Sequence, residues 1–158
     1  MRTRSAAALP FALAVALMPV ASLPVAAQSE DTDIQAVRTD LESLATYAQA
    51  GNLDAMGSLY APGRGVHIIE GAGVNHGWED YRDHHLAPEL ASFENFEYRY
   101  FSIEPVVRGD VAYSAFRYEL KADTPSGHIE VEGRGTAVLE RIDGSWKVVH
   151  IHTSGRRR

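Results

Sequence analysis

The first part of the chain after residue 28 has the apolar spacing of an amphipathic helix. Between residues 29 and 52, apolar residues recur every three or four positions and leave the intervening positions polar. Gly51 and Asn52 are typical of a helix end. This spacing predicts one long helix with a single buried stripe. The stripe comprises Ile34, Val37, Leu41, Leu44, Ala45 and Ala48.

Two further helices and a small hairpin are predicted before residue 94. Residues 53–61 form a short apolar segment that is followed by a proline and a glycine, which end a helix. Residues 65–77 contain two short β-type runs separated by glycines, the pattern of a hairpin. Residues 78–93 have helical spacing, and Pro88 inside them is expected to kink or split the helix.

The rest of the chain predicts four long strands rich in β-branched and aromatic residues. Short turn sequences such as Arg-Gly-Asp and Asp-Gly-Ser connect them, and short connections join antiparallel neighbours. The predicted class is therefore α+β, in the order α-α-β-β-α-β-β-β-β, with a mostly antiparallel sheet. The four strands cover residues 96–107, 111–122, 128–142 and 145–154.

The first 27 residues have the layout of a secretory signal peptide. Arg2 and Arg4 precede a long apolar run, and Val25 and Ala27 are small residues at the −3 and −1 positions of a cleavage site. The alternative is an uncleaved membrane anchor, but three prolines interrupt the run. We therefore expect residues 1–27 to be a cleaved signal peptide and residues 28–158 to be one periplasmic or secreted domain, without a membrane association after cleavage.

Composition narrows the chemistry of the domain. The chain has no cysteine, which excludes disulfides, thiolate metal sites and thiol nucleophiles. Its net charge of −6 argues against nucleic acid as a partner. Serine-nucleophile motifs and the glycine loops that bind dinucleotides or phosphates are missing from the sequence, and we expect no cofactor.

The order of elements and the ending Asp-Gly-Ser-Trp-Lys-Val-Val-His-Ile-His-Thr-Ser-Gly resemble the nuclear transport factor 2 (NTF2)-like superfamily. The SnoaL-like branch and the association (hub) domain of calcium/calmodulin-dependent kinases are the most similar. The resemblance implies a cone-shaped curved sheet wrapped around the N-terminal helices, with an internal pocket. It also implies that Ala115, Ala137 and Thr153 line this pocket and that the outer face of the sheet meets a second subunit. Because this superfamily contains enzymes, binders and assembly modules, the fold does not imply one activity.

Two histidines near the end of the chain, His150 and His152, lie two residues apart and therefore share one face of the last strand. The apolar set of the preceding strand, 131–139, faces the interior, and Val149, Ile151 and Thr153 are its natural companions. The two histidines are then expected on the outer face, in a homodimer surface together with Trp146, Phe116, Tyr118 and Arg134. A metal site at His150 and His152 is the less favoured alternative, because two histidines alone are a weak ligand pattern.

Several side chains are candidates for the pocket. Tyr81 and His85 lie one helical turn apart, and His85 is the candidate able to titrate near neutral pH. Arg117 shares strand parity with Ala115 and is expected to bind a carboxylate. The predicted ligand-binding residues are Trp78, Tyr81, His85, Tyr113, Arg117 and Thr153.

Three functions agree with these features. The favoured one is the binding of a small organic ligand in an internal pocket. The second is a lyase, isomerase or cyclase that acts on a cyclic organic substrate, with His85 and Tyr81 as candidate catalytic residues. The third is a homo-oligomerisation module. A pocket that contains both His85 and Arg117 would favour the first two.

Overall fold

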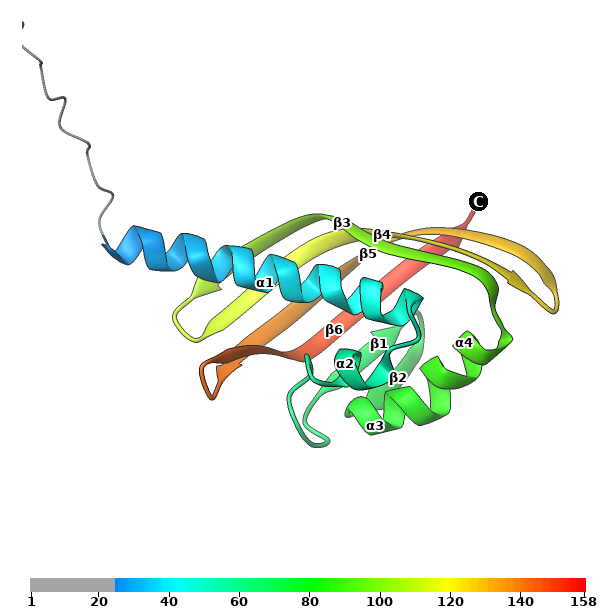
Figure 1. Ribbon diagram of the computed structural model, residues 1–158, viewed down its shortest axis with the longest axis horizontal. Coiled ribbons are helices and arrows are strands. Elements are labelled where there is room, and N and C mark those ends of the chain that lie inside the picture. The colour runs from blue at the N-terminus through cyan, green and yellow to red at the C-terminus, as the bar shows by residue number, and fades with distance from the viewer. Residues whose placement is uncertain (1–24) are drawn as a thin grey trace, which may run out of the picture.

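The computed structural model describes residues 25–158, which form a curved six-stranded sheet with helices along one side (Figure 1). The predicted signal peptide lies outside these residues, apart from Val25, Ala26 and Ala27. Within the described part of the chain, no helix is long and apolar enough to cross a membrane. The predicted α+β class and the predicted order of elements are confirmed, with the third helix divided into segments.

Helix α1, Val25–Gln49, lies across the inner face of the sheet (Figure 1). Its buried residues are Val37, Leu41, Leu44, Ala45 and Ala48, which all belong to the predicted apolar stripe. The guanidinium of Arg38 donates a hydrogen bond to the carbonyl of Ile103. A charged residue of the helix thus also contacts the backbone of the sheet. A short helix, α2 (Leu53–Gly57), follows the turn.

The strands lie in the order β2-β1-β6-β5-β4-β3. All neighbours are antiparallel except β1 and β6, which run parallel. The pairing of β1 with the last strand was not foreseen from the sequence, and it brings the small hairpin beside the C-terminal end of the chain. The strands are β1 (His67–Glu70), β2 (Gly73–His76), β3 (Glu94–Arg108), β4 (Val111–Thr124), β5 (Gly127–Ile142) and β6 (Ser145–Arg157).

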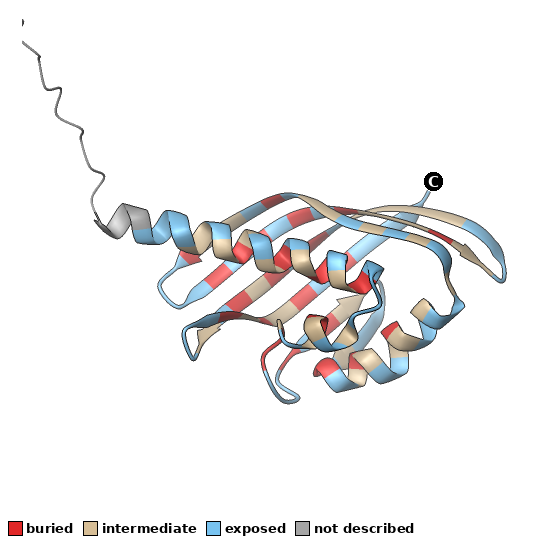
Figure 2. Ribbon diagram, in the orientation of Figure 1, coloured by how far each residue is buried: buried red, intermediate tan, exposed pale blue. Residues whose placement is uncertain are grey.

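Strand β4 turns Phe116 and Tyr118 inward. Ser114, Phe116 and Tyr118 are buried, while the residues between them are exposed, as the alternating colours of Figure 2 show. The expectation that Phe116 and Tyr118 form an outer dimer surface is therefore wrong. Their rings lie over Gly135 and Gly133 of β5, where an added Cβ would come within 2.3 Å of either ring. Small residues on β5 thus make room for large residues on β4.

A register shift in β6 explains a second correction. Leu139 pairs with Val148 and Val138 pairs with His150, so that Val149 is an extra residue in the ladder. Residues before and after the bulge therefore have opposite parity. Trp146 and Val148 are buried on the helix side, so the placement of Trp146 on the outer face is also wrong.

Candidate functional site

A helical segment with a widened turn closes one end of the cone. It runs through α3 (Trp78–Tyr81), η1 (Arg82–Leu86) and α4 (Ala87–Ser92), and its middle part is a π-helix in which the Ala87 N–H donates to the carbonyl of Arg82. Pro88 has no N–H to offer the carbonyl one α-helical turn earlier, and its ring crowds that carbonyl. The widened turn is therefore a consequence of Pro88, and such turns occur often at functional sites.

The hairpin β1–β2 leads directly into this segment and fixes its position. Gly77 precedes α3 with φ = 95°, a backbone conformation that side chains rarely allow. The carboxylate of Asp80 accepts a hydrogen bond from the backbone N–H of His76 at 2.8 Å. These contacts set the helical segment against the end of β1, where Glu70 lies.

Glu70 contacts both Tyr81 and His85, the two pocket candidates that the sequence places one helical turn apart. The hydroxyl of Tyr81 donates to Glu70 Oε1 at 2.8 Å, and His85 Nε2 lies 2.9 Å from Glu70 Oε2. The Tyr81 and His85 rings are 5.3 Å apart between centroids. About a quarter of the His85 side chain, 25%, is exposed, so solvent and a ligand can reach this acid–base cluster.

The electrostatic environment favours a charged His85. Its hydrogen bond to Glu70 raises the pKa of His85 above the usual 6.5, and the charges of Glu70 and Glu89 add to this effect, although burial opposes it. Burial raises the pKa of Tyr81 well above 10.0, and the neighbouring carboxylate of Glu70 raises it further. The cluster therefore holds a histidine that titrates above its usual pH, next to a tyrosine that stays protonated.

The charge of Glu70 acts on five tyrosines of the inner side, of which Tyr81 contacts its carboxylate. Burial is the main cause of their raised pKa values, and the charge of Glu70 contributes to each shift. The hydroxyl of Tyr98 donates to that of Tyr100 at 3.1 Å. Such rings present apolar faces with polar tips. The five tyrosines are Tyr60, Tyr81, Tyr98, Tyr100 and Tyr118.

Trp78 and Thr153, two more predicted ligand-binding residues, are on the inner side of the sheet. Trp78 is buried and stacks on Tyr60 at 5.1 Å between ring centroids. Thr153 is buried and pairs in register with Glu70 through the parallel β1–β6 ladder. The structure thus brings Trp78, Tyr81, His85 and Thr153 into one region around Glu70.

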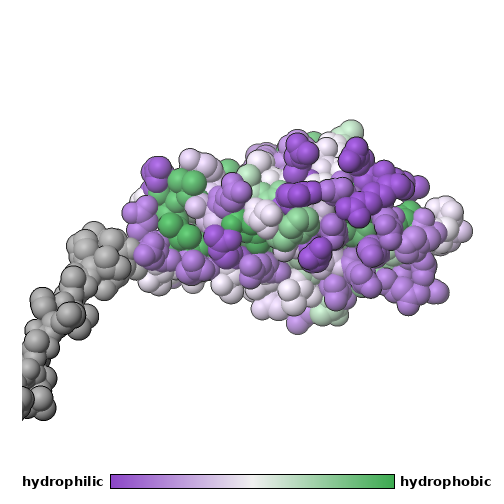
Figure 3. Space-filling view, turned by 90° about the horizontal axis from the view of Figure 1, so that it is seen from above, coloured by the Kyte–Doolittle hydropathy of each residue, from purple (hydrophilic) through white to green (hydrophobic). Residues whose placement is uncertain are grey.

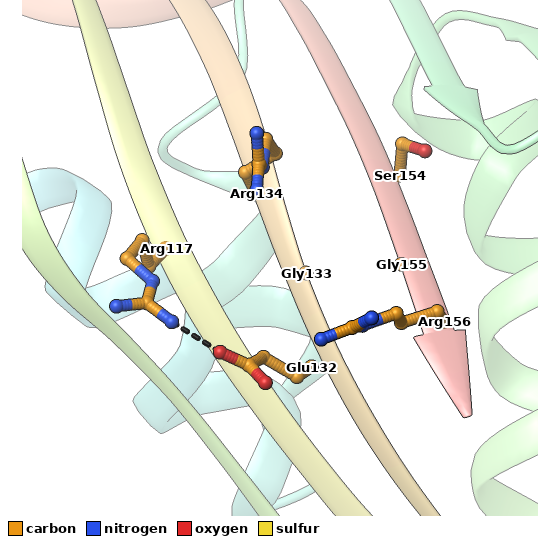
Figure 4. Close-up of a pocket in the computed structure, with 7 residues that line it drawn as sticks. All are labelled: Arg117, Glu132, Gly133, Arg134, Ser154, Gly155 and Arg156. Atoms are coloured by element: carbon orange, nitrogen blue, oxygen red, sulfur yellow. Dashed lines mark hydrogen bonds and ion pairs between the residues drawn. The ribbon is translucent and has the colours of Figure 1, made fainter. Parts of the chain in front are cut away.

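The predicted inward orientation of Tyr113 and Arg117 is wrong, because both belong to the exposed set of β4. Tyr113 is 50% exposed. Arg117 forms an ion pair with Glu132 in an open groove of about 500 Å³ on the outer face of the sheet (Figure 4). Ala115, which shares their parity, is exposed as well. An inner-pocket carboxylate clamp by Arg117 is therefore ruled out in this arrangement.

His150 and His152 lie on the outer face, as predicted. His150 is partly buried and His152 is exposed, whereas Ile151 between them is buried. Burial lowers the pKa of His150, and the nearby His67 and His152 lower it further. Arg134, predicted for the same face, is exposed there.

Glu70, His85 and Glu89 place three potential ligand atoms within 4.8 Å of one another, close enough for a shared cation. Two observations favour a proton over a metal ion at this position. The His85–Glu70 contact already has the length of a charge-assisted hydrogen bond. Glu89 lies 3.6 Å from His85 and its side chain is 49% exposed. It therefore adds negative charge near His85 but makes no direct hydrogen bond to it.

Glu70 is not among the site residues predicted from the sequence. Its signal was available, because Glu70 ends a strand in which Ile68 faces inward, and residues two apart share a face. What the pattern could not supply was the position of that strand beside β6. From the sequence, one of Tyr98 or Tyr100 on β3 was a possible pocket residue, and the two irregularities in the register of β3 could not be predicted.

The curved sheet, the helices along its inner side and the acid–base cluster at one end define an α+β cone of the NTF2-like class. The family model of the SnoaL-like domain matches residues 37–156. This protein therefore belongs to the SnoaL-like family. Among curated proteins there is no match.

Solved structures share this fold at low sequence identity. An NTF2-like superfamily protein from Salmonella enterica has a TM-score of 0.69 and 16% identity, over 85% of this chain and 95% of that chain. A protein from Novosphingobium aromaticivorans named for scytalone dehydratase has a TM-score of 0.71 and 11% identity, over 84% and 88%. A protein from Xanthomonas campestris named for the association domain of calcium/calmodulin-dependent protein kinase II has a TM-score of 0.62 and 21% identity, over 86% and 93%.

Proposed function

We propose that this protein binds a small cyclic organic molecule beside Glu70 and His85 and transfers a proton to or from it, as a lyase or isomerase does. The observation that supports this proposal is the 2.9 Å contact between His85 Nε2 and Glu70 Oε2. A histidine with a raised pKa, a partner carboxylate and partial exposure has the properties of a general acid or base.

The three polar side chains would have different tasks. His85 gives a proton to the ligand, or takes one from it, and exchanges it with solvent through its exposed side. Glu70 stabilises the imidazolium, and Tyr81 holds the second oxygen of Glu70 and so fixes the carboxylate. The rings of Tyr98 and Tyr100 provide an apolar wall for a cyclic ligand.

Proton transfer can be measured before the natural ligand is known. Native mass spectrometry of the purified protein should detect a retained small molecule, and cyclic ketones and phenols would serve as probes. For each binder, NMR in D₂O follows the replacement of carbon-bound hydrogen by deuterium. We expect exchange with the wild-type protein and a loss of at least about 100-fold for His85→Gln, the usual scale of general acid–base catalysis.

The neighbouring His84 supplies a matched control. Its side chain is 74% exposed and contacts Asp80 instead of Glu70, so His84→Gln should leave exchange unchanged. Binding with no exchange in the wild-type protein would contradict the catalytic part and leave a binding protein. The absence of any binder among the probes, together with no retained molecule, would contradict both parts and favour the assembly module.

We further propose a homodimer through the outer face of the sheet. On β4, Val111 and Tyr113 are exposed by 42% and 50%, which is unusual for large apolar side chains. Tyr113 also lines a groove of about 510 Å³ with Val106 and Val138 of the neighbouring strands. Figure 3 shows apolar side chains gathered toward the end of the molecule where α1 begins. A covered outer face would remove this apolar surface from water.

We propose, finally, that the protein acts outside the cytoplasm, in the periplasm or as a secreted protein. The support is the basic start, the apolar run and the Val25–Ala27 cleavage pattern. The absence of cysteine is compatible with an oxidising compartment, because no thiol is present there to oxidise.

A further inference from the structure

Four histidines from three strands meet on the outer face of the sheet. In the parallel β1–β6 ladder His67 pairs with His150, and in the β1–β2 hairpin His67 pairs with His76. His152 follows His150 by two residues and therefore points to the same side. We call His67, His76, His150 and His152 the histidine cluster. It lies apart from Glu70 and His85, which are on the inner side.

The spacing within the cluster suits one metal ion bound by several of its histidines. Neighbouring strands lie about 4.8 Å apart, and residues i and i+2 of one strand lie about 7 Å apart. One histidine on β1 and two on β6 thus form a compact triangle, from which three imidazoles can converge on one point. The rings of His67 and His76 are already 5.1 Å apart between centroids.

The neighbours of the cluster favour a metal ion over a proton. The adjacent outer positions are uncharged. On β5, Val138 pairs with His150 and Thr136 pairs with His152, and on β1, Ile69 pairs with His152 from the other side. None of these three positions carries a carboxylate, and the Asp80 carboxylate accepts from the backbone N–H of His76, so protonated histidines on β1 and β6 would repel one another. The neutral imidazole is the form of histidine that binds a metal ion.

We propose that His67, His150 and His152 bind one late first-row transition-metal ion, Cu²⁺, Ni²⁺ or Zn²⁺, with His76 or water as the fourth ligand. Imidazole nitrogen suits these ions, and three histidines plus water are a known four-coordinate arrangement. His67 and His152 are exposed, so their rings can rotate to reach ligand distance. The sequence favoured an interface for His150 and His152, because the β1 histidine beside them was not foreseen.

The test uses the full chain without a polyhistidine tag, stripped with chelator and titrated with Cu²⁺, Ni²⁺ and Zn²⁺ in separate calorimetric experiments. We expect one ion per chain and the tightest binding for Cu²⁺, the order that nitrogen ligands impose. His67→Gln and His152→Gln should each weaken binding by at least about tenfold. Loss of a residue that only hydrogen-bonds to a metal ligand already has an effect of that size. Electron paramagnetic resonance of the Cu²⁺ form should show coordinated histidine nitrogens.

Two other variants act as controls. His128→Gln removes a histidine of the β4–β5 hairpin that contacts Asp123, and His85→Gln removes the histidine of the inner cluster. Both should bind metal as the wild-type protein does. Binding that survives His67→Gln and His152→Gln, or that is lost in His85→Gln, would overturn the proposal. A ratio of one ion per two chains would place the ligands in two copies and would overturn it as well, whatever the oligomeric state of the metal-free protein.

Thermal melts of the metal-free proteins check that the variants fold. All these histidine side chains except His85 lie at the surface, where substitutions change stability by no more than about 0.5 kcal/mol. A variant that melts like the wild-type protein and has lost the ion therefore reports on the ligand itself.

Discussion

His85 Nε2 lies 2.9 Å from Glu70 Oε2, although one residue belongs to a π-helical turn and the other ends a short strand. The contact joins the helical segment and the hairpin strand at the end of the cone that the helical segment closes. It also raises the pKa of His85 and places this histidine among tyrosines that remain protonated. The chemistry proposed for this protein depends on that pair.

Replacement of Glu70 by Gln should lower the pKa of His85. The hydrogen bond to the carboxylate is the main cause of the raised value, and an amide cannot replace its charge. NMR titration of the His85 ring in both proteins measures the effect. Glu79→Gln, a change to an exposed carboxylate on α3, is the control and should leave the His85 pKa unaltered.

The same pair should make stability depend on pH. A histidine with a raised pKa in the folded state stabilises the protein fully below its unfolded pKa, about 6.5, and this contribution is lost as pH rises through the folded value. Thermal melts of the wild-type protein and His85→Gln should therefore differ most below pH 6.5 and converge above the folded pKa of His85. A constant difference across this range would contradict the assigned ion pair.

Pro88→Ala should narrow the π-helical turn to an α-helical one. Alanine supplies the N–H that proline lacks, so the regular backbone hydrogen bond can form and the preceding turn rotates. His85 would then leave Glu70, and its pKa should fall toward 6.5, as NMR titration can show. Pro125→Ala, in the exposed β4–β5 turn, is the control. An unchanged His85 pKa in Pro88→Ala would mean that contacts other than the proline hold the turn.

Gly135→Ala should destabilise the fold by about 1–3 kcal/mol, the usual cost of overpacking. Its Cβ would lie 2.3 Å from the Phe116 ring and 2.9 Å from the carbonyl oxygen of His152. Gly65→Ala is the matched control, because nothing lies within 4 Å of its added Cβ. Chemical denaturation of the three proteins measures the difference, and equal stabilities would contradict the tight ring–glycine packing.

Tyr113→Asp should shift the proposed dimer toward monomer, because it introduces a charge into the apolar part of the outer face. Val74→Asp is the control: Val74 is similarly exposed, 51%, but lies on β2 at the opposite edge of the sheet.

Trp146→Ala should instead cost about 3–5 kcal/mol of stability without changing association, because Trp146 is buried inside. Sedimentation at several concentrations distinguishes these outcomes, and a monomeric wild-type protein would refute the dimer.

Export should produce a protein that begins at Gln28. The small residues Val25 and Ala27 precede this position in the pattern that signal peptidases recognise. N-terminal sequencing of the protein recovered from the periplasm or medium tests the cleavage. A membrane-bound protein that still carries Met1 would support the anchor alternative instead.

The sequence by itself determined the class of fold and the order of its elements. The buried stripe of α1 follows the predicted spacing, and the four long strands occupy the predicted segments within a few residues. It also placed Tyr81 and His85 on neighbouring turns. These features follow from local periodicity, which the helix and the strand impose on the residues that they bury.

The choice of face on β4 could not be made from the same periodicity. Both sets of alternating residues contain small and aromatic side chains, with Ser114, Phe116 and Tyr118 in one set and Tyr113 and Arg117 in the other. The stronger signal was the charge of Arg117 and of Glu119, two positions later, which marks their set as exposed. The resemblance to the hub pocket favoured the wrong set, so Tyr113 and Arg117 were placed inside.

Tertiary structure alone decided which distant residues share a site. The parallel pairing of β1 with β6 brings Glu70 beside Thr153 on the inner side and His67 beside His150 on the outer side. The bulge at Val149 reverses the parity of β6 and sends Trp146 inward while the histidines stay outside. Periodicity assigns residues to two faces within an uninterrupted strand, but strand order and bulges depend on packing between segments far apart in the chain, which no local pattern records.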